Sequence, residues 1–158
     1  MAALKLAQRY LTIAALGLWL GGFTLYTAVV IRIGHRLVGG GRFGFVTAQV
    51  TSALDVLAAI AVVAVIVNLI ASRRALTGGL KWTSLATAAV LAGGAVAAFV
   101  LHGRLDALLD VQAREISDPT RFRALHERYE MAATVQWAAG LLHLWCALAA
   151  WRRQDSAG

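Results

Sequence analysis

Four long apolar stretches dominate this sequence and decide what it can fold into. They cover residues 11–31, 46–71, 82–101 and 131–151. Each holds about 20 residues or more, and at about 1.5 Å rise per residue a helix of that length crosses a hydrocarbon core of ~30 Å. Because lipid-exposed backbone must satisfy its own hydrogen bonds, the sequence predicts an all-α membrane protein. We expect a single domain, a bundle of four transmembrane helices.

The composition excludes most soluble classes. Apolar residues make up 59% of the 158 residues and charged residues only 15%, against roughly 25% in soluble domains. A soluble chain of this size cannot bury so much apolar surface. The formal charge of +7 comes mostly from residues beside the apolar stretches, where lipid headgroups favour them. We therefore expect a lipid bilayer as partner, and no nucleic acid.

The three connections between the stretches differ in character. Residues 32–45 contain three successive glycines and are predicted to form a flexible turn. Residues 72–81 predict a short polar turn. Residues 102–130 predict two helical extensions that meet at Ser117-Asp118-Pro119, where a capping side chain followed by proline starts the last helix. The third and fourth helices should therefore form one extended hairpin.

An even number of spans places both termini on one side of the membrane. Lysine and arginine are almost equally frequent on the two sides. Those on the side of the termini lie closer to the span ends and have few acidic neighbours. On this basis we expect a bacterial cytoplasmic membrane protein with both termini in the cytoplasm.

Small residues mark two places where helices could approach closely. Gly17 and Gly21 have the GxxxG spacing, and Gly93 and Gly94 lie among alanines. Close approach matters in lipid, where no hydrophobic force drives helices together. Either a seam within the bundle or a homodimer face would explain this pattern.

Polar residues within the spans are costly and need a reason. They are Gln49, Ser52, Asp55, Asn68, Gln136 and His143. Gln49, Ser52 and Asp55 are three residues apart and are predicted to share roughly one helix face. Asp55 is the only formal charge in its span, and we name Arg32 and His35 as its candidate partners. It is either a satisfied structural group or a carboxylate that carries ions or protons.

Two histidine–carboxylate pairs flank the turn of the expected hairpin. His102 precedes Asp106 by four residues, and His126 precedes Glu130 by four, which makes each pair neighbours on a helix. The hairpin would bring the two pairs to one level, near His35. This predicts an ion network, a transition-metal site or a relay of protons or ions to Asp55.

Haem and enzymatic activity are not expected. A haem held by two histidines needs both at matching depth, here His35 with His102 or His126. No P-loop, HExxH, GxSxG or CxxC motif occurs in the chain, so the motifs that mark common catalytic sites are missing.

Several segments resemble one family. They are LWLGGFTLY at 18–26, GFVT at 44–47 with Val50-Thr51 after it, HGRLDALLD at 102–110 and LHERY at 125–129. They are similar to a family of small four-span membrane proteins of unknown function, which includes a human transmembrane protein associated with platinum-drug resistance. The resemblance covers most of the chain. It implies the same four-helix fold and membrane location, and little about chemistry.

Three functional hypotheses follow. The first is a protein that moves, or helps to move, a small solute, ion or metal through its polar residues. The second is an accessory subunit of a homodimer or larger membrane complex. The third is a redox protein that binds a metal or haem.

Overall fold

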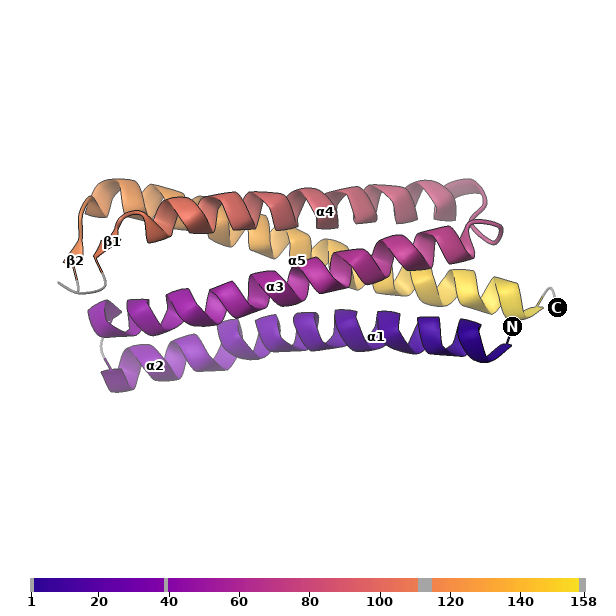
Figure 1. Ribbon diagram of the computed structural model, residues 1–158, viewed down its shortest axis with the longest axis horizontal. Coiled ribbons are helices and arrows are strands. Elements are labelled where there is room, and N and C mark those ends of the chain that lie inside the picture. The colour runs from indigo at the N-terminus through magenta and orange to yellow at the C-terminus, as the bar shows by residue number, and fades with distance from the viewer. Residues whose placement is uncertain (1, 39, 111–114, 157–158) are drawn as a thin grey trace.

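The computed structural model describes residues 2–38, 40–110 and 115–156, almost all of them helical. The elements are α1 (Ala2–Leu25), a π-helical turn (Tyr26–Val30), α2 (Ile31–Val38), α3 (Gly40–Ser72), α4 (Gly78–Asp106), β1 (Leu109–Asp110), β2 (Glu115–Ile116) and α5 (Pro119–Ser156). The first three follow one another along a single rod, so the molecule is a bundle of four long rods (Figure 1).

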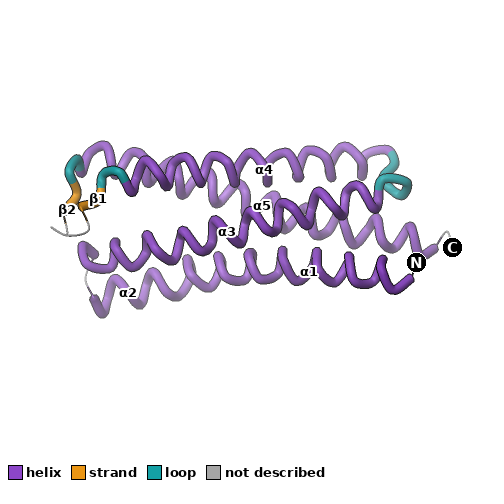
Figure 2. The backbone as a smooth tube through the Cα atoms, in the orientation of Figure 1, coloured by secondary structure: helices purple, strands orange, loops and turns teal. Residues whose placement is uncertain are grey.

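The rods run antiparallel to their neighbours in sequence (Figure 2). Both termini and the turn between α3 and α4 lie at one end of the bundle, here called the terminal end. The connection from α2 to α3 and the β1–β2 pair lie at the other, here called the hairpin end. Contacts are most extensive between α4 and α5 and between α1 and α3.

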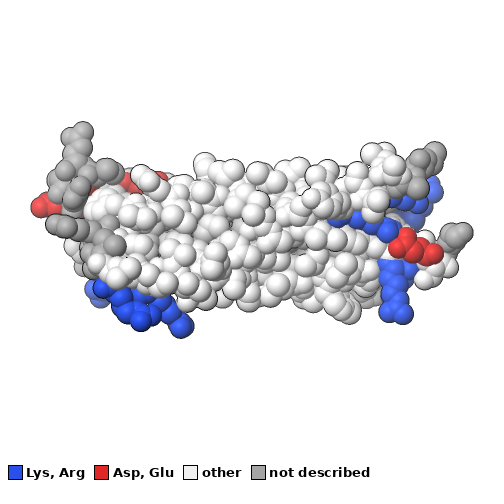
Figure 3. All heavy atoms as spheres, turned by 90° about the horizontal axis from the view of Figure 1, so that it is seen from below, with Lys and Arg blue, Asp and Glu red and all other residues white. Residues whose placement is uncertain are grey.

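The membrane prediction is confirmed. Four helical segments are long and apolar enough to span a bilayer: Ala3–Leu37, Phe43–Ser72, Gly78–Asp106 and Pro119–Ser156. Large apolar side chains such as Phe99 and Val96 are 76% and 66% exposed on the outside of the bundle. Charged side chains gather at its two ends (Figure 3). An apolar belt between charged ends is the surface that a bilayer solvates, so the chain is an integral membrane protein.

The predicted flexible turn at residues 32–45 is wrong. Helix α2 continues to Val38, and α3 already begins at Gly40. The two helices can lie this close because Gly34 has no side chain. A Cβ at Gly34 would overlap the ring of Phe43 on α3. The glycine therefore lets both helices continue almost to the hairpin end.

The predicted helical extension after residue 102 is shorter than expected, because α4 ends at Asp106. The chain then forms an antiparallel strand pair in which Leu109 faces Ile116. The Ser117 amide and hydroxyl both donate to the Leu108 carbonyl, at 3.0 and 3.1 Å, and these bonds close the turn. Residues 111–114 lie outside the described part of the chain.

The expected start of the last helix is confirmed. The carboxylate of Asp118 accepts a hydrogen bond of 2.9 Å from the Arg121 amide. That bond satisfies one of the free amides at a helix N-terminus. Pro119, which has no amide proton to leave unpaired, is the first helical residue.

The short turn predicted at residues 72–81 is confirmed. The Ala75 amide donates to the Ser72 carbonyl at 2.9 Å, and α4 begins at Gly78. Gly78 has φ +54°, a conformation that costs glycine little and a β-carbon more.

The core depends on glycines that differ in part from those predicted. A Cβ at Gly94 would lie 2.9 Å from Gln136, and one at Gly140 would lie 2.7 Å from the Trp19 ring. At Gly17, Gly21 and Gly93 it would meet nothing within 4 Å. Gly94 is therefore a packing residue as expected, and Gly140 is an additional one. Gly17 and Gly21 therefore form no seam within the described part of the bundle and face outward.

Candidate functional site

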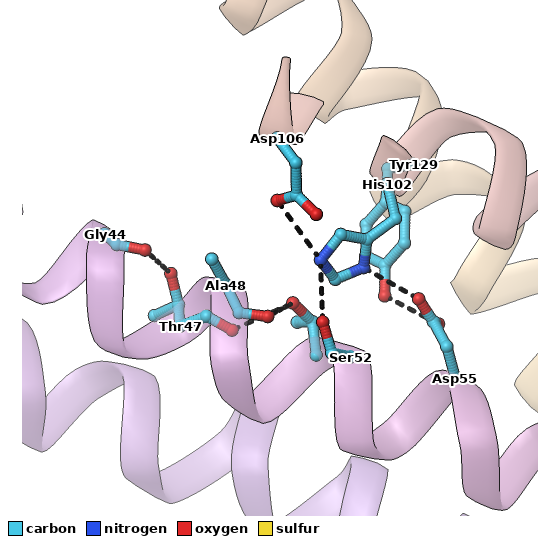
Figure 4. Close-up of polar contacts among 9 residues, drawn as sticks. Gly44, Thr47, Ala48, Ser52, Asp55, His102, Asp106 and Tyr129 are labelled. Carbon is cyan, nitrogen blue, oxygen red and sulfur yellow. Dashed lines mark hydrogen bonds and ion pairs between the residues drawn. The ribbon is translucent and has the colours of Figure 1, made fainter. Parts of the chain in front are cut away.

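Asp55 lies near the middle of α3 and points toward α4 and α5 (Figure 4). Its side chain is only 15% exposed. The two carboxylate oxygens have separate partners: Oδ2 lies 2.8 Å from Nδ1 of His102, and Oδ1 accepts a hydrogen bond of 3.0 Å from the Tyr129 hydroxyl. A carboxylate within an apolar span is stable only with such partners, and here α4 and α5 supply one each.

The His102 imidazole lies at the centre of the site. Its side chain is 10% exposed, and its ring packs edge-on against Tyr129, with the centroids 5.8 Å apart. While Nδ1 faces Asp55, Nε2 lies 3.2 Å from the Ser52 hydroxyl and 3.6 Å from the Asp106 carboxylate. Both ring nitrogens are therefore engaged, each with a carboxylate nearby.

The site reaches the molecular surface at the hairpin end. Asp106, one helical turn after His102, has a side chain that is 53% exposed. Ser52 is exposed as well. We call Ser52, Asp55, His102, Asp106 and Tyr129 the Asp55 cluster. It forms a line of ionisable groups from an exposed carboxylate to one within the apolar part of the bundle.

This arrangement suits proton exchange. An imidazole can accept a proton at one nitrogen and release one from the other. A proton that reaches Nε2 from the side of Asp106 makes the ring cationic between two carboxylates. The proton on Nδ1 can then pass to Asp55 and neutralise it. The geometry therefore links the charge of an intramembrane carboxylate to the solvent at the hairpin end.

The partners predicted for Asp55 are wrong. Arg32 and His35 both lie on α2 and are exposed. The ring of His35 packs instead against Phe43, with centroids 5.5 Å apart. Asp55 faces away from α2 because its helix position points to α4 and α5, where His102 and Tyr129 lie.

The predicted convergence of both histidine–carboxylate pairs is also wrong. His126 and Glu130 do lie 3.4 Å apart, but their side chains are 47% and 61% exposed. His126 stacks on Phe122 rather than facing His102. The inward positions of α5 include Leu125 and Tyr129, and His126 lies about 100° round the helix from Leu125.

The converging ligand set predicted for a metal ion is therefore not formed. Among the side chains that the structure describes, no three His, Cys, Asp or Glu residues come close enough to hold a metal ion. His102, one of the histidines named for both the metal and the haem hypothesis, engages both of its ring nitrogens with protein groups.

The predicted common face of Gln49, Ser52 and Asp55 is only partly formed. Ser52 and Asp55 both reach His102, whereas Gln49 is exposed. A step of three residues advances about 300° around a helix, which is ~60° short of a full turn. Over two steps Gln49 is turned about 120° away from Asp55.

The polar residues of the terminal end form a separate network. The Asn68 carbonyl oxygen accepts from Gln8 at 2.9 Å, Trp151 at 2.9 Å and Ser72 at 3.4 Å. We call these four residues the Asn68 cluster. All of its groups are neutral, and Asn68 itself is only 2% exposed. The cluster joins α1, α3 and α5.

His143 and Gln136 are also bonded within the bundle. His143 is 1% exposed, and its Nδ1 lies 2.9 Å from the Thr87 hydroxyl. Its Nε2 is buried with no hydrogen-bond partner in the described part of the chain. The Gln136 amide donates to the Leu91 carbonyl at 3.1 Å. Both side chains tie α5 to α4.

Sequence reasoning did not assign Tyr129 to the site. Tyrosines are common at membrane interfaces. A tyrosine beside a span therefore gives no sign that its hydroxyl donates a hydrogen bond within the bundle. The signal that could have found it is the spacing of Leu125, Tyr129 and Ala133, four residues apart along α5 and all buried. That spacing marks the inward face, where a hydroxyl needs a partner.

No known protein family matches this chain, and no curated protein or solved structure is significantly similar to it. The resemblance proposed from the sequence therefore stays a prediction, and the function has to be argued from the geometry.

Proposed function

We propose that this protein moves, or helps to move, an ion across a bacterial cytoplasmic membrane, and that the ion is the proton. Both termini would lie in the cytoplasm. In this proposal the Asp55 cluster is the proton-binding site, and its outer carboxylate faces the opposite side of the membrane.

The observation that carries the proposal is the position of His102 between two carboxylates. One, Asp55, is enclosed in the bundle, and the other, Asp106, is half exposed. Intramembrane ionisable residues are rare and commonly mark proton or ion pathways. A purely structural pair has no need of the second, exposed carboxylate.

Protonation would also change the packing of the bundle. The charged Asp55 carboxylate holds α4 through His102 and α5 through Tyr129. Once Asp55 is protonated it is a weaker acceptor, because hydrogen bonds to charged groups are roughly twice as strong. The proton would therefore loosen the contact of α3 with both neighbours, which gives the bundle a way to couple proton binding to movement.

Proton flux into vesicles tests the proposal. The purified protein is reconstituted into vesicles that enclose a pH-sensitive dye, and a potassium diffusion potential drives protons inward. The wild type should acidify the vesicles faster than protein-free vesicles do. Asp55→Asn and His102→Gln should abolish the difference.

Ser52→Ala is the matched control, since it removes a hydroxyl from the same cluster without removing an ionisable group. It should retain at least half of the wild-type flux. Equal flux in wild-type and protein-free vesicles would overturn the proposal. So would an Asp55→Asn variant as active as the wild type.

An accessory role is the second candidate, favoured by the outward position of Gly17 and Gly21. Open GxxxG faces bring transmembrane helices together. Replacing Gly17 by leucine should then release a second copy, or another membrane subunit, from the purified complex. Unchanged mass of the complex by light scattering would argue against this role.

A further inference from the structure

A groove runs along the outside of the bundle between α4 and α5. Its volume is about 350 Å³. Gly93, Gly94 and Ala97 line it on α4, and Arg128, Met131 and Val135 line it on α5. It faces outward within the apolar part of the molecule, so its natural surroundings are lipid chains.

Two adjacent glycines shape the groove, because one contacts α5 and the other, about 100° further round the helix, faces outward. At Gly94 a Cβ would lie 2.9 Å from Gln136, so the backbones are close there. At Gly93 a Cβ would meet nothing within 4 Å. The floor is therefore the Gly94–Gln136 contact, and the space above Gly93 is open to a slender apolar group.

The guanidinium group of Arg128 lies at one end of this groove. Arg128 is exposed, and among the described side chains no carboxylate lies within salt-bridge distance of it. It precedes Met131 by three residues, so it lies ~4.5 Å nearer the hairpin end. From there a long arginine side chain can extend toward the lipid phosphates at the end of the apolar span. A guanidinium binds phosphate through two parallel hydrogen bonds.

The groove is too small to enclose a helix. One turn of a helix with side chains is about 5.4 Å long and 10–12 Å wide, which is roughly 400 Å³ or more. The groove therefore holds less than a single turn. An acyl chain is thin enough to follow it.

We propose that the α4–α5 groove binds one anionic phospholipid. Its phosphate pairs with Arg128, and one acyl chain lies over Gly93 between Ala97 and Val135. A net negative headgroup is favoured over a zwitterionic one because the latter brings its own cation to the phosphate. The lipid would cover the seam between α4 and α5 beside Tyr129. Its binding does not depend on the proposed proton movement.

Native mass spectrometry of the full-length protein in mild detergent tests this. The protein is mixed with phosphatidylglycerol or with phosphatidylcholine, and the retained lipids are counted. The wild type should keep one phosphatidylglycerol and bind phosphatidylcholine about tenfold more weakly. Arg128→Gln should lose that preference, and Gly93→Leu, which fills the groove, should lose both lipids.

Two variants serve as controls. Arg123→Gln removes an exposed arginine from the same helix, and Gly79→Leu fills an equally open glycine position at the other end of α4. Both should bind lipid as the wild type does. Because Arg128 is exposed, its variant reports on lipid binding even if Gly93→Leu unfolds.

Three results would overturn the proposal. They are equal retention of the two lipids by the wild type, unchanged preference in Arg128→Gln, and loss of a second protein copy instead of a lipid in Gly93→Leu. The last would make the groove a contact between subunits.

Discussion

The hairpin end and the terminal end of the bundle bury polar side chains in two different ways. At the terminal end the Asn68 carbonyl collects three neutral donors. At the hairpin end Asp55 and His102 are both ionisable, and the exposed Asp106 connects them to solvent. Neutral groups that satisfy one another fix helix positions, whereas ionisable groups that reach solvent can change their charge. We therefore propose that the first cluster contributes stability and that the second exchanges protons.

Asp55→Asn should produce the largest effect. Asparagine keeps the shape and can still accept a hydrogen bond from Tyr129, but it cannot take up a proton. Proton flux should fall to that of protein-free vesicles, while the free energy of unfolding changes by less than it does in Asn68→Ala. A loss of stability that accounts for the whole loss of flux would remove the distinction between the two ends.

Asn68→Ala should be the most destabilising change. Hydrogen bonds between membrane helices average about 0.6 kcal/mol and reach about 1.7 kcal/mol, and three donors lose one shared acceptor. The free energy of unfolding should drop by about 2 kcal/mol, measured by denaturing-detergent titration in mixed micelles. Flux per folded molecule should be unchanged. A variant that folds normally but conducts no protons would place function at the terminal end as well.

Thr87→Val should cost less, about 1 kcal/mol. Valine keeps the shape but leaves Nδ1 of the buried His143 without its partner at 2.9 Å. Thr83→Val is the matched control one turn earlier on α4, where the hydroxyl bonds only to the Gly79 carbonyl. The same titration compares the two, and equal stabilities would mean that the His143 bond contributes nothing.

Tyr129→Phe should have a smaller effect on the other cluster. The ring against His102 stays, and only the hydroxyl that donates to Asp55 at 3.0 Å is lost. We expect proton flux to change by about threefold, since one hydrogen bond is worth roughly 0.6 kcal/mol in this setting. A complete loss of flux would make the hydroxyl itself part of the relay.

Arg9→Gln should have the smallest effect. Arg9 pairs with Asp155 at 2.9 Å, but that carboxylate is 64% exposed. Exposed pairs contribute little to stability and weaken with salt. The free energy of unfolding should therefore fall only slightly at low salt and not at all at high salt. A larger loss would show that Arg9 also holds Trp151, above whose ring it lies at 5.5 Å.

The polar residues show how far sequence reasoning reached. It selected Asp55 and His102 because ionisable groups near membrane depth are costly, and both belong to the site. It paired His102 correctly with Asp106. It offered the wrong partners, Arg32 and His35, for Asp55, and it wrongly brought His126 to His102. Which neighbour a side chain meets depends on the rotation of each helix about its axis. A deviation of ~100° turns an inward residue outward, and spacing along one helix does not give the rotation of the next.

The sequence by itself determined the class of protein and its spans. Predominantly apolar stretches of about 20 residues, without the alternating pattern of a barrel strand, leave the backbone no solution in lipid other than a helix. The cap at Asp118 and Pro119 needed only local chemistry. The tertiary structure alone decided that α2 and α3 remain helical up to the hairpin end, because Gly34 admits the ring of Phe43. It also decided that Tyr129 joins Asp55 and that Gly94 and Gly140, not Gly17, lie at the seams. Such contacts join residues far apart in the chain, and they exist only once the helices have packed.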